Sequence, residues 1–326
     1  MNKNIKIILN YFLGPVLFIV LSWNLYQQIS HQPDLPQRWA QIKLSWHQAS
    51  FWLVLLLMFV NWGLEARKWQ LLMAPLEKFS FLKSYKSVLA GCSVTMLTPN
   101  RIGEFGGRIV YVQEEHRLSA ISLTILGSIS QLFITIIMGT TGLIVFRYFS
   151  QSDAVLFKLL PALAGDILVY VSIAVSAVLI FLYLRVGALA SLLERVHFLK
   201  RFVKQIYLLH AFGRKQLLRI LFLSFLRYLV FILQYILLLH VLQVDIAYVV
   251  CFWLLSVFYL VMAIAPTIGF IELPVRAAAS VELLQLYSTN VIGIQAASLG
   301  IWLINLVIPA VAGSLLIFGI KIMKEK

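Results

Sequence analysis

Six long apolar stretches constrain the fold of this 326-residue chain more than any other feature. They cover residues 8–28, 49–72, 118–146, 160–184, 217–242 and 294–319. Each is close to or above the roughly 20 residues that a helix needs to cross the hydrocarbon core of a bilayer. With 61% hydrophobic and 12% charged residues, the chain cannot form the surface of a water-soluble protein. Because the stretches are continuous rather than alternating, they argue against an outer-membrane barrel, and we predict an all-α, polytopic integral membrane protein.

Two further apolar regions are interrupted in the middle by a proline followed by a glycine: Pro99 and Gly103 in residues 84–117, and Pro266 and Gly269 in residues 247–287. Proline ends or kinks a helix. Non-helical backbone at membrane depth is tolerated only where protein or a water-filled cavity covers it. We therefore predict that each region is a broken or re-entrant helical hairpin, so that the protein has about six full spans and two such hairpins.

The chain has a formal charge of +14, from 27 Lys and Arg against 13 Asp and Glu. The basic residues lie mainly in short segments between the spans, which is the pattern of membrane orientation and not of nucleic-acid binding. If the N-terminus is inside, twenty basic residues, Lys68 and Arg108 among them, are cytoplasmic, and four are outside: Arg38, Lys43, Arg147 and Lys158. We predict that both termini are cytoplasmic and that nucleic acid is not a partner.

The two halves of the chain repeat the same order of elements. Residues 49–146 and 217–319 each contain a span, a broken hairpin and a second span, and the second half starts from the opposite side of the membrane. Both breaks follow proline with glycine, glutamate and then an arginine four residues after the glutamate: PNRIGEFGGR at 99–108 and PTIGFIELPVR at 266–276. Inverted repeats of broken helices are typical of transporters whose substrate site lies at the repeat interface. The alternative is that Pro and Gly kink two unrelated helices.

The remaining segments are expected to flank or connect these halves within a single membrane domain. Residues 1–48 are predicted to form an N-terminal helix and an outer loop, and residues 147–216 a linking hairpin with a basic amphipathic connector. In the connector, residues 189–207 place apolar side chains on one helical face and basic side chains largely elsewhere. This pattern indicates a helix at the cytoplasmic membrane surface, although the positive-inside rule alone also explains its basic residues.

Five charged residues in the broken segments are the candidate substrate-binding residues: Arg101, Glu104, Arg108, Glu272 and Arg276. A charge within a membrane segment costs about 2.5–3.5 kcal/mol on insertion scales, so each needs a partner or a wet cavity. The breaks also free backbone N–H groups at the start of the returning half-helices, where an anion is favoured. Arginine can bind a phosphate through two parallel hydrogen bonds, so we predict a phosphate-binding site here. The alternative is that each Glu–Arg pair is closed and only locks its hairpin.

One charge lies inside a full span and needs a separate explanation. Arg227 is ten residues into the span 217–242. Several polar residues in other spans or in its own are candidates to hydrogen-bond it or a cavity: Asn61, Glu65, Gln131, Gln234 and Asn305. We therefore expect some of these side chains to lie close to Arg227.

The sequence gives little support for an enzyme. Its six histidines are scattered without metal-ligand spacing, and no nucleophile motif or Walker-type loop is present. The one compact acid–base cluster is Glu114, Glu115 and His116, which we interpret as a solvated helix end. We predict no catalytic residue, no metal site and no cofactor.

At the broken segments the chain resembles a known family, the lysylphosphatidylglycerol synthase transmembrane family with its flippase-like membrane domain. The resemblance is carried by Pro-x-Arg-x-Gly-Glu at residues 99–104 with Arg108, and by Pro-Thr-x-Gly-x-x-Glu at residues 266–272. It extends over roughly residues 8–320. Within the motifs the chain departs from the family by Asn100 after the first proline and by Pro274 after Glu272.

The resemblance implies a lipid translocase in the inner (plasma) membrane of a prokaryote, without the separate soluble domain that performs synthesis in some relatives. The implied partner is a membrane lipid with an anionic headgroup, such as an anionic phospholipid or a polyprenyl phosphate, and protein partners stay open. Two alternatives remain: an intramembrane lipid-phosphate or glycosyl transferase, and an accessory membrane subunit that transports nothing. An arginine-lined phosphate site would serve a transferase as well as a translocase.

Overall fold

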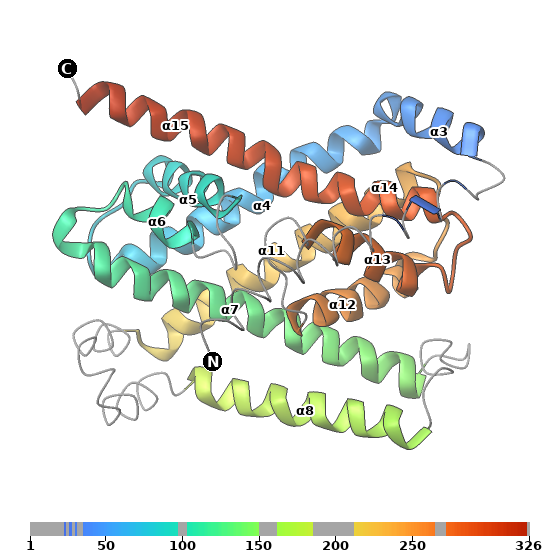
Figure 1. The fold of residues 1–326 in the computed structure, drawn as a ribbon. Helices are drawn as coiled ribbons and strands as arrows, with labels where there is room; N and C mark the ends of the chain where they lie inside the picture. The colour runs from blue at the N-terminus through green and yellow to red at the C-terminus, as the bar shows by residue number, and fades with distance from the viewer. Residues whose placement is uncertain are drawn as a thin grey trace, which may run out of the picture.

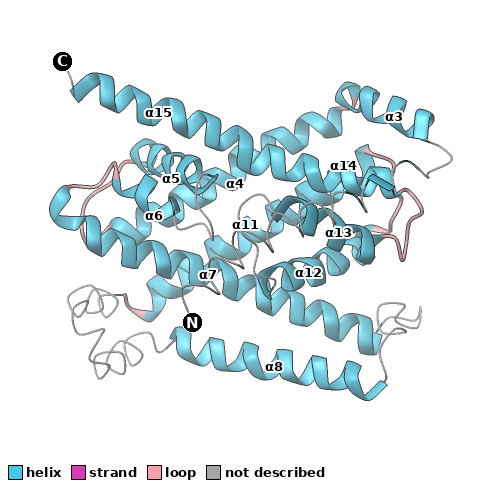
Figure 2. Cartoon of the chain, viewed as in Figure 1, coloured by secondary structure: helices cyan, strands magenta, loops and turns pink. Residues whose placement is uncertain are grey.

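The computed structural model describes residues 35–96, 103–149, 162–184, 212–264 and 272–324, together with positions 23, 26, 27 and 30. These residues form helices and short loops and contain no β-strand (Figure 2). Five stretches are long and apolar enough to cross a membrane: Ala49–Met73, Glu114–Phe149, Leu163–Tyr183, Arg214–Val241 and Val291–Phe318. The predicted all-α, polytopic membrane fold is therefore confirmed. The predicted first span, residues 8–28, falls almost wholly outside the described residues.

The long helices coincide with the predicted spans. They are α4 (Ala49–Met73), α7 (Arg117–Ile144), α8 (Ala162–Leu184), α11 (Arg214–Val241) and a last span made of α14 (Val291–Trp302), the π-helical η9 (Leu303–Val307) and α15 (Ile308–Lys324). A short helix, α3 (Leu35–Leu44), precedes them. In an apolar solvent only a helix satisfies all backbone hydrogen bonds within one segment, which is why these apolar sequences are helical.

The two interrupted regions form pairs of shorter helices. The first pair is α5 (Phe81–Met96) and α6 (Gly103–Ile109), and the second is α12 (Tyr248–Ile264) and α13 (Glu272–Leu284). At 1.5 Å per residue, α5 and α12 are about 24 and 26 Å long, short of the ~30 Å hydrocarbon core. The first pair lies toward one end of the long helices and the second toward the other end (Figure 1). The breaks themselves, residues 97–102 and 265–271, lie outside the described residues, so their re-entrant geometry stays a prediction.

The helix pairs cross over between the two halves. At the centre α4 packs against α11, while α5 packs against α15 and α12 packs against α7. Both crossed contacts depend on glycine, because a Cβ on Gly313 would stand 1.9 Å from the Leu89 carbonyl oxygen and one on Gly139 would stand 2.4 Å from Leu260 Cβ. Each hairpin thus contacts the last span of the opposite half, which is the pattern expected if a two-fold axis relates the halves. The inverted repeat of residues 49–146 and 217–319 stays a prediction.

Helix α8 lies at the edge of the bundle and packs on α7 (Figure 1). Three polar contacts fasten it: Tyr183 OH lies 3.0 Å from Ser130 Oγ, Thr140 Oγ1 lies 3.1 Å from Ser176 Oγ, and Arg147 Nε donates to Asp166 Oδ1 at 2.8 Å. An apolar helix packs about as well against lipid as against another helix, so apolar contacts alone do not hold an edge helix in place. Interhelical hydrogen bonds such as these help to do so.

Candidate functional site

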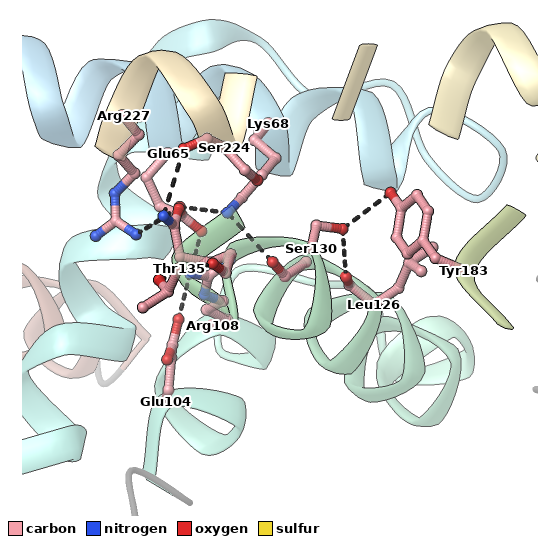
Figure 3. A network of polar contacts seen from close by, with 12 residues as sticks. Glu65, Lys68, Glu104, Arg108, Leu126, Ser130, Thr135, Tyr183, Ser224 and Arg227 are labelled. Atoms are coloured by element: carbon pink, nitrogen blue, oxygen red, sulfur yellow. Dashed lines mark hydrogen bonds and ion pairs between the residues drawn. The ribbon is translucent and has the colours of Figure 1, made fainter. Parts of the chain in front are cut away.

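Five ionisable side chains meet inside the bundle (Figure 3). They are Glu65 and Lys68 on α4, Glu104 and Arg108 on α6, and Arg227 on α11. Glu65 is the centre of this charge network: its Oε1 accepts a hydrogen bond of 2.8 Å from Arg108 Nη2, and its Oε2 lies 2.8 Å from Lys68 Nζ and 3.2 Å from Arg227 Nη1. Arg108 Nη2 also pairs with Glu104.

Helical spacing and close packing bring the network together. Glu65 and Lys68 are three residues apart and Glu104 and Arg108 four apart, so each pair lies on one helical face. Helix α6 lies directly against α5, because a Cβ on Gly107 would stand 2.1 Å from the Ala90 carbonyl oxygen. This contact leaves room only for glycine and directs Arg108 toward α4.

Two aromatic and hydroxyl contacts hold Arg108 in that direction. Its guanidinium carbon lies 5.1 Å from the ring centre of Trp69, and Ser87 Oγ donates to its carbonyl oxygen at 2.9 Å. Trp69 Nε1 in turn donates to Ser87 Oγ at 3.0 Å. The arginine is thereby fixed from α4 and α5 at once, with its side chain pre-oriented toward Glu65.

The network reaches from the first hairpin to the middle of the long helices α7 and α11. Arg227 lies near the middle of the 28-residue α11, and its Nη1 also donates to Gln131 Oε1, near the middle of α7, at 3.4 Å. The side chains of Glu65, Lys68 and Arg108 are at most 5% exposed, whereas Arg227 is 22% and Glu104 is 25% exposed. Arg227 and Glu104 are therefore the two partly exposed members of the network.

The charges in the network do not balance. With all five side chains ionised, the described members of the network are three cations and two carboxylates, which together carry one net positive charge. An uncompensated charge inside an apolar bundle is costly, so this arrangement favours the binding of an anion. Among the described residues no group of three or more His, Cys, Asp or Glu has the arrangement of a metal site.

Only part of the predicted set of site residues can be located. Glu104 and Arg108 lie together, and Gly103 is buried at the start of α6. Arg276 on α13 has a different neighbour, since its guanidinium carbon lies 6.0 Å from the ring centre of Tyr259. The remaining predicted residues, Pro99, Arg101, Pro266 and Gly269, and the side chain of Glu272, lie outside the described residues.

Two members of the network, Lys68 and Arg108, are among the twenty basic residues that we expect on the cytoplasmic side. That side stays a prediction, but neither side chain is exposed. Lys68 is 1% exposed within α4, and Arg108 is 2% exposed within α6, because Glu65 holds each as an ion pair. A lysine three residues from a glutamate inside an apolar span was the sequence signal for Lys68. The remaining excess of basic residues still favours cytoplasmic termini, which stay a prediction.

Arg227 has two of its expected partners, Glu65 and Gln131. The other polar residues bond elsewhere: Asn61 Nδ2 donates to Asn305 Oδ1 at 3.1 Å, and Gln234 Nε2 donates to the Val54 carbonyl oxygen at 2.9 Å. The acid–base cluster at residues 114–116 is a 3-10 turn, with the Glu114 and Glu115 side chains 85% and 73% exposed, as a solvated helix end would be.

Comparison with known proteins identifies the family. Neither the curated proteins nor the solved structures include a match to this chain. The family described as lysylphosphatidylglycerol synthase TM region matches residues 12–313, which include all five helical stretches that could cross a membrane except the last five residues of the fifth. The chain therefore belongs to the lysylphosphatidylglycerol synthase transmembrane-region family, a multi-pass membrane family linked to lipid handling.

Proposed function

We propose that this protein is a lipid translocase that moves a lipid with an anionic, phosphate-bearing headgroup between leaflets without changing it covalently. The observation that carries the proposal is the unbalanced positive charge of the network around Glu65. Membership of a lipid-handling membrane family supports a lipid, rather than a soluble anion, as the substrate. We include the predicted residues Arg101, Glu104, Arg108, Glu272 and Arg276 in the binding site and add Glu65, Lys68 and Arg227.

On this proposal the members of the network have different roles. Arg227 is partly exposed and meets the phosphate first, while buried Glu65 holds Arg227 and Arg108 in place. Glu104 is partly exposed and shares Arg108 with Glu65. A phosphate can therefore replace the Glu104 carboxylate on Arg108, because both are anions that accept the same guanidinium hydrogen bonds. Each time a headgroup binds, this exchange would break the ion pair between Glu104 and Arg108 within α6.

The larger arrangement proposed is an inverted repeat that opens alternately to the two leaflets. The crossed packing of α5 on α15 and of α12 on α7 supports it. We place both termini in the cytoplasm and the protein in the plasma membrane of a prokaryote, on the distribution of basic residues and the resemblance of its motifs.

The test is a leaflet-accessibility assay in liposomes. Fluorescently labelled lipids are incorporated in both leaflets, and an impermeant reductant then bleaches the label exposed outside. With wild-type protein we expect nearly complete bleaching of a labelled anionic phospholipid, against about half in protein-free vesicles. Arg227→Gln should slow the movement about tenfold or more, since a hydrogen bond to a charged group contributes about 1.5–3 kcal/mol. Arg227→Lys should lie between the two, because lysine keeps the charge and loses the planar pair of donors.

The matched control is Arg147→Gln. Arg147 is also 22% exposed and also bound to a carboxylate, that of Asp166, but it lies outside the charge network. This variant should move lipid at the wild-type rate. A correctly inserted wild-type protein that moves none of a panel of phospholipids and polyprenyl phosphates would contradict the proposal, and covalent conversion of one of them would identify a transferase instead.

A further inference from the structure

A line of polar side chains runs along α11 from the charge network toward the second hairpin. Ser224, Tyr228 and Tyr235 are spaced by four and seven residues, which places them along one side of the helix, with Arg227 next to Tyr228. From Ser224 to Tyr235 the helix rises about 16 Å, roughly half of the hydrocarbon thickness. Polar residues in such a line are unusual in a helix whose other faces are apolar.

Along this line, buried polar atoms of α11 and of the neighbouring helices lack a hydrogen bond of good geometry within the protein. Within the described residues, this holds for Ser224 Oγ, Arg227 Nε and the hydroxyls of Tyr228 and Tyr235 on α11, for the Tyr259 hydroxyl on α12 and for Ser298 Oγ on α14. Ser224 and Tyr235 are fully buried, and Ser298 is 1% exposed. Buried polar groups are almost always satisfied in native structures, and lipid offers them no partner. Six such groups along α11 and the helices that face it are therefore placed where they could bind a polar guest.

Polar groups of neighbouring helices lie close to these tyrosine hydroxyls, and two of them already donate a hydrogen bond to a backbone carbonyl oxygen. Tyr228 faces Ser256, whose hydroxyl donates to the Phe252 carbonyl oxygen at 2.8 Å. Tyr235 faces Ser298 and Ser280, and the Ser280 hydroxyl donates to the Ala277 carbonyl oxygen at 2.8 Å. Tyr259 faces Arg276. Each of these tyrosine hydroxyls keeps a free acceptor lone pair, and the single O–H of Tyr228 or Tyr235 can donate either to the neighbouring serine oxygen or to a polar guest.

The line ends at the arginine of the second hairpin. The rings of Tyr235 and Tyr259 have centres 6.3 Å apart, and the guanidinium carbon of Arg276 lies 6.0 Å from the centre of the Tyr259 ring. Arg276 is only 7% exposed. In the fold α11, α12, α13 and α14 lie together at this end of the bundle (Figure 1). One arginine therefore stands at each end of the line, Arg227 at the charge network and Arg276 at the second hairpin.

We infer that this line, which we call the hydroxyl path, carries the lipid headgroup between Arg227 and Arg276. It rests on the proposed translocase function and deepens it. The phosphate is held by an arginine at either end, and between them the hydroxyls of Tyr228, Tyr259 and Tyr235 replace the hydrogen bonds that water gives the headgroup outside. Neutral hydroxyls suit a passage better than further charges, since a site in a pathway must release its guest as readily as it binds it.

The test removes hydroxyls while keeping the rings. In the liposome assay with a labelled anionic phospholipid, Tyr235→Phe and Tyr259→Phe should each slow movement roughly threefold to tenfold, the range expected for the loss of one neutral hydrogen bond. The matched control is Tyr183→Phe. Tyr183 is 3% exposed and its hydroxyl bonds to Ser130 and to the Leu217 carbonyl oxygen, away from the path. This variant should move lipid at the wild-type rate.

Each further outcome distinguishes the path from the function on which it rests. If wild-type protein moves lipid and the double variant Tyr235→Phe/Tyr259→Phe moves it equally fast, the path is wrong and the translocase stands. If wild-type protein moves no lipid, the proposed function itself fails. A third outcome is that the tyrosine variants lose proton movement driven by a pH gradient while their lipid movement is unchanged. The line would then conduct protons, and the proposed path for the headgroup would be wrong. If a tyrosine variant fails to fold, Ser298→Ala provides an independent test, because it removes a hydroxyl of the path without changing a ring. This variant should also slow lipid movement.

Discussion

At the scale of single residues, Glu65 determines whether the charge network is stable. Its carboxylate contacts Lys68, Arg108 and Arg227, and its side chain is 5% exposed. The desolvation cost of the buried carboxylate is offset only while its cationic partners are present. The contribution of each ion pair to stability therefore depends on the others. Loss of any one partner would therefore destabilise the fold. On our proposal the network is retained because it binds the substrate.

This dependence predicts a large effect at Arg108. Arg108→Gln leaves the buried Glu65 carboxylate with one cation fewer and close to the partly exposed Glu104, and should lower the free energy of unfolding by about 3–5 kcal/mol. For comparison, Arg147→Gln breaks a partly exposed ion pair and should cost less than about 1 kcal/mol. Thermal unfolding of both variants in detergent measures the difference. Equal midpoints for the two variants would mean that the network around Glu65 is not formed in the folded protein.

At the scale of elements, glycine controls how closely the hairpins pack. A Cβ on Gly107 would overlap the Ala90 carbonyl group of α5, and one on Gly313 would overlap the Leu89 carbonyl group. Both contacts are made by α5, which therefore lies between α6 and α15 with glycine on each side. Small residues at helix contacts let backbones approach in membranes, where apolar side chains gain little by leaving lipid.

Two adjacent glycines of α6 allow a controlled comparison. Gly107→Ala must push α6 away from α5 and should destabilise the protein by about 1–3 kcal/mol, as overpacking does. Gly106→Ala meets nothing within 4 Å and should be neutral or stabilising by up to about 1 kcal/mol, because alanine favours a helix. Thermal unfolding midpoints check the order of the two variants. We further expect Gly107→Ala to slow lipid movement, since it displaces Arg108. The liposome assay measures this effect independently of thermal stability.

The sequence allowed the helices to be predicted better than the site, for a physical reason. A span such as Arg214–Val241 is visible because its apolar residues are consecutive. The network was only partly predictable: Glu104 and Arg108 are neighbours on one helical face, but the ion pair between Glu65 and Arg108 joins residues 43 positions apart. Nothing local in the sequence specifies that contact, which depends on the close packing of α6 on α5. Lys68 was expected only as one of the basic residues that orient the protein, and its burial beside Glu65 was not predicted.

At the scale of the whole molecule, the crossed hairpins tie the two halves into one body. Helix α5 of the first half packs on α15 of the second, and α12 of the second packs on α7 of the first, with α4 and α11 between them. Neither half could move as a unit without breaking its contact with the other's hairpin. On the translocase proposal, the moving parts are therefore a hairpin together with the opposite half's last span, and not the halves themselves.

The orientation of the hairpins gives the prediction that belongs to this scale. The loops on both sides of α5–α6 contain Lys78 and Glu115, and those on both sides of α12–α13 contain Asp245 and Gln285, all four exposed. Opposite hairpins place these loops on opposite sides of the membrane. In a variant without the two native cysteines, Lys78→Cys and Glu115→Cys should react with an impermeant maleimide only from the cytoplasmic side, because the basic residues favour that side. Asp245→Cys and Gln285→Cys should react only from outside. Labelling of intact and of inverted vesicles measures both, and reaction of all four positions from one side would contradict the inverted repeat.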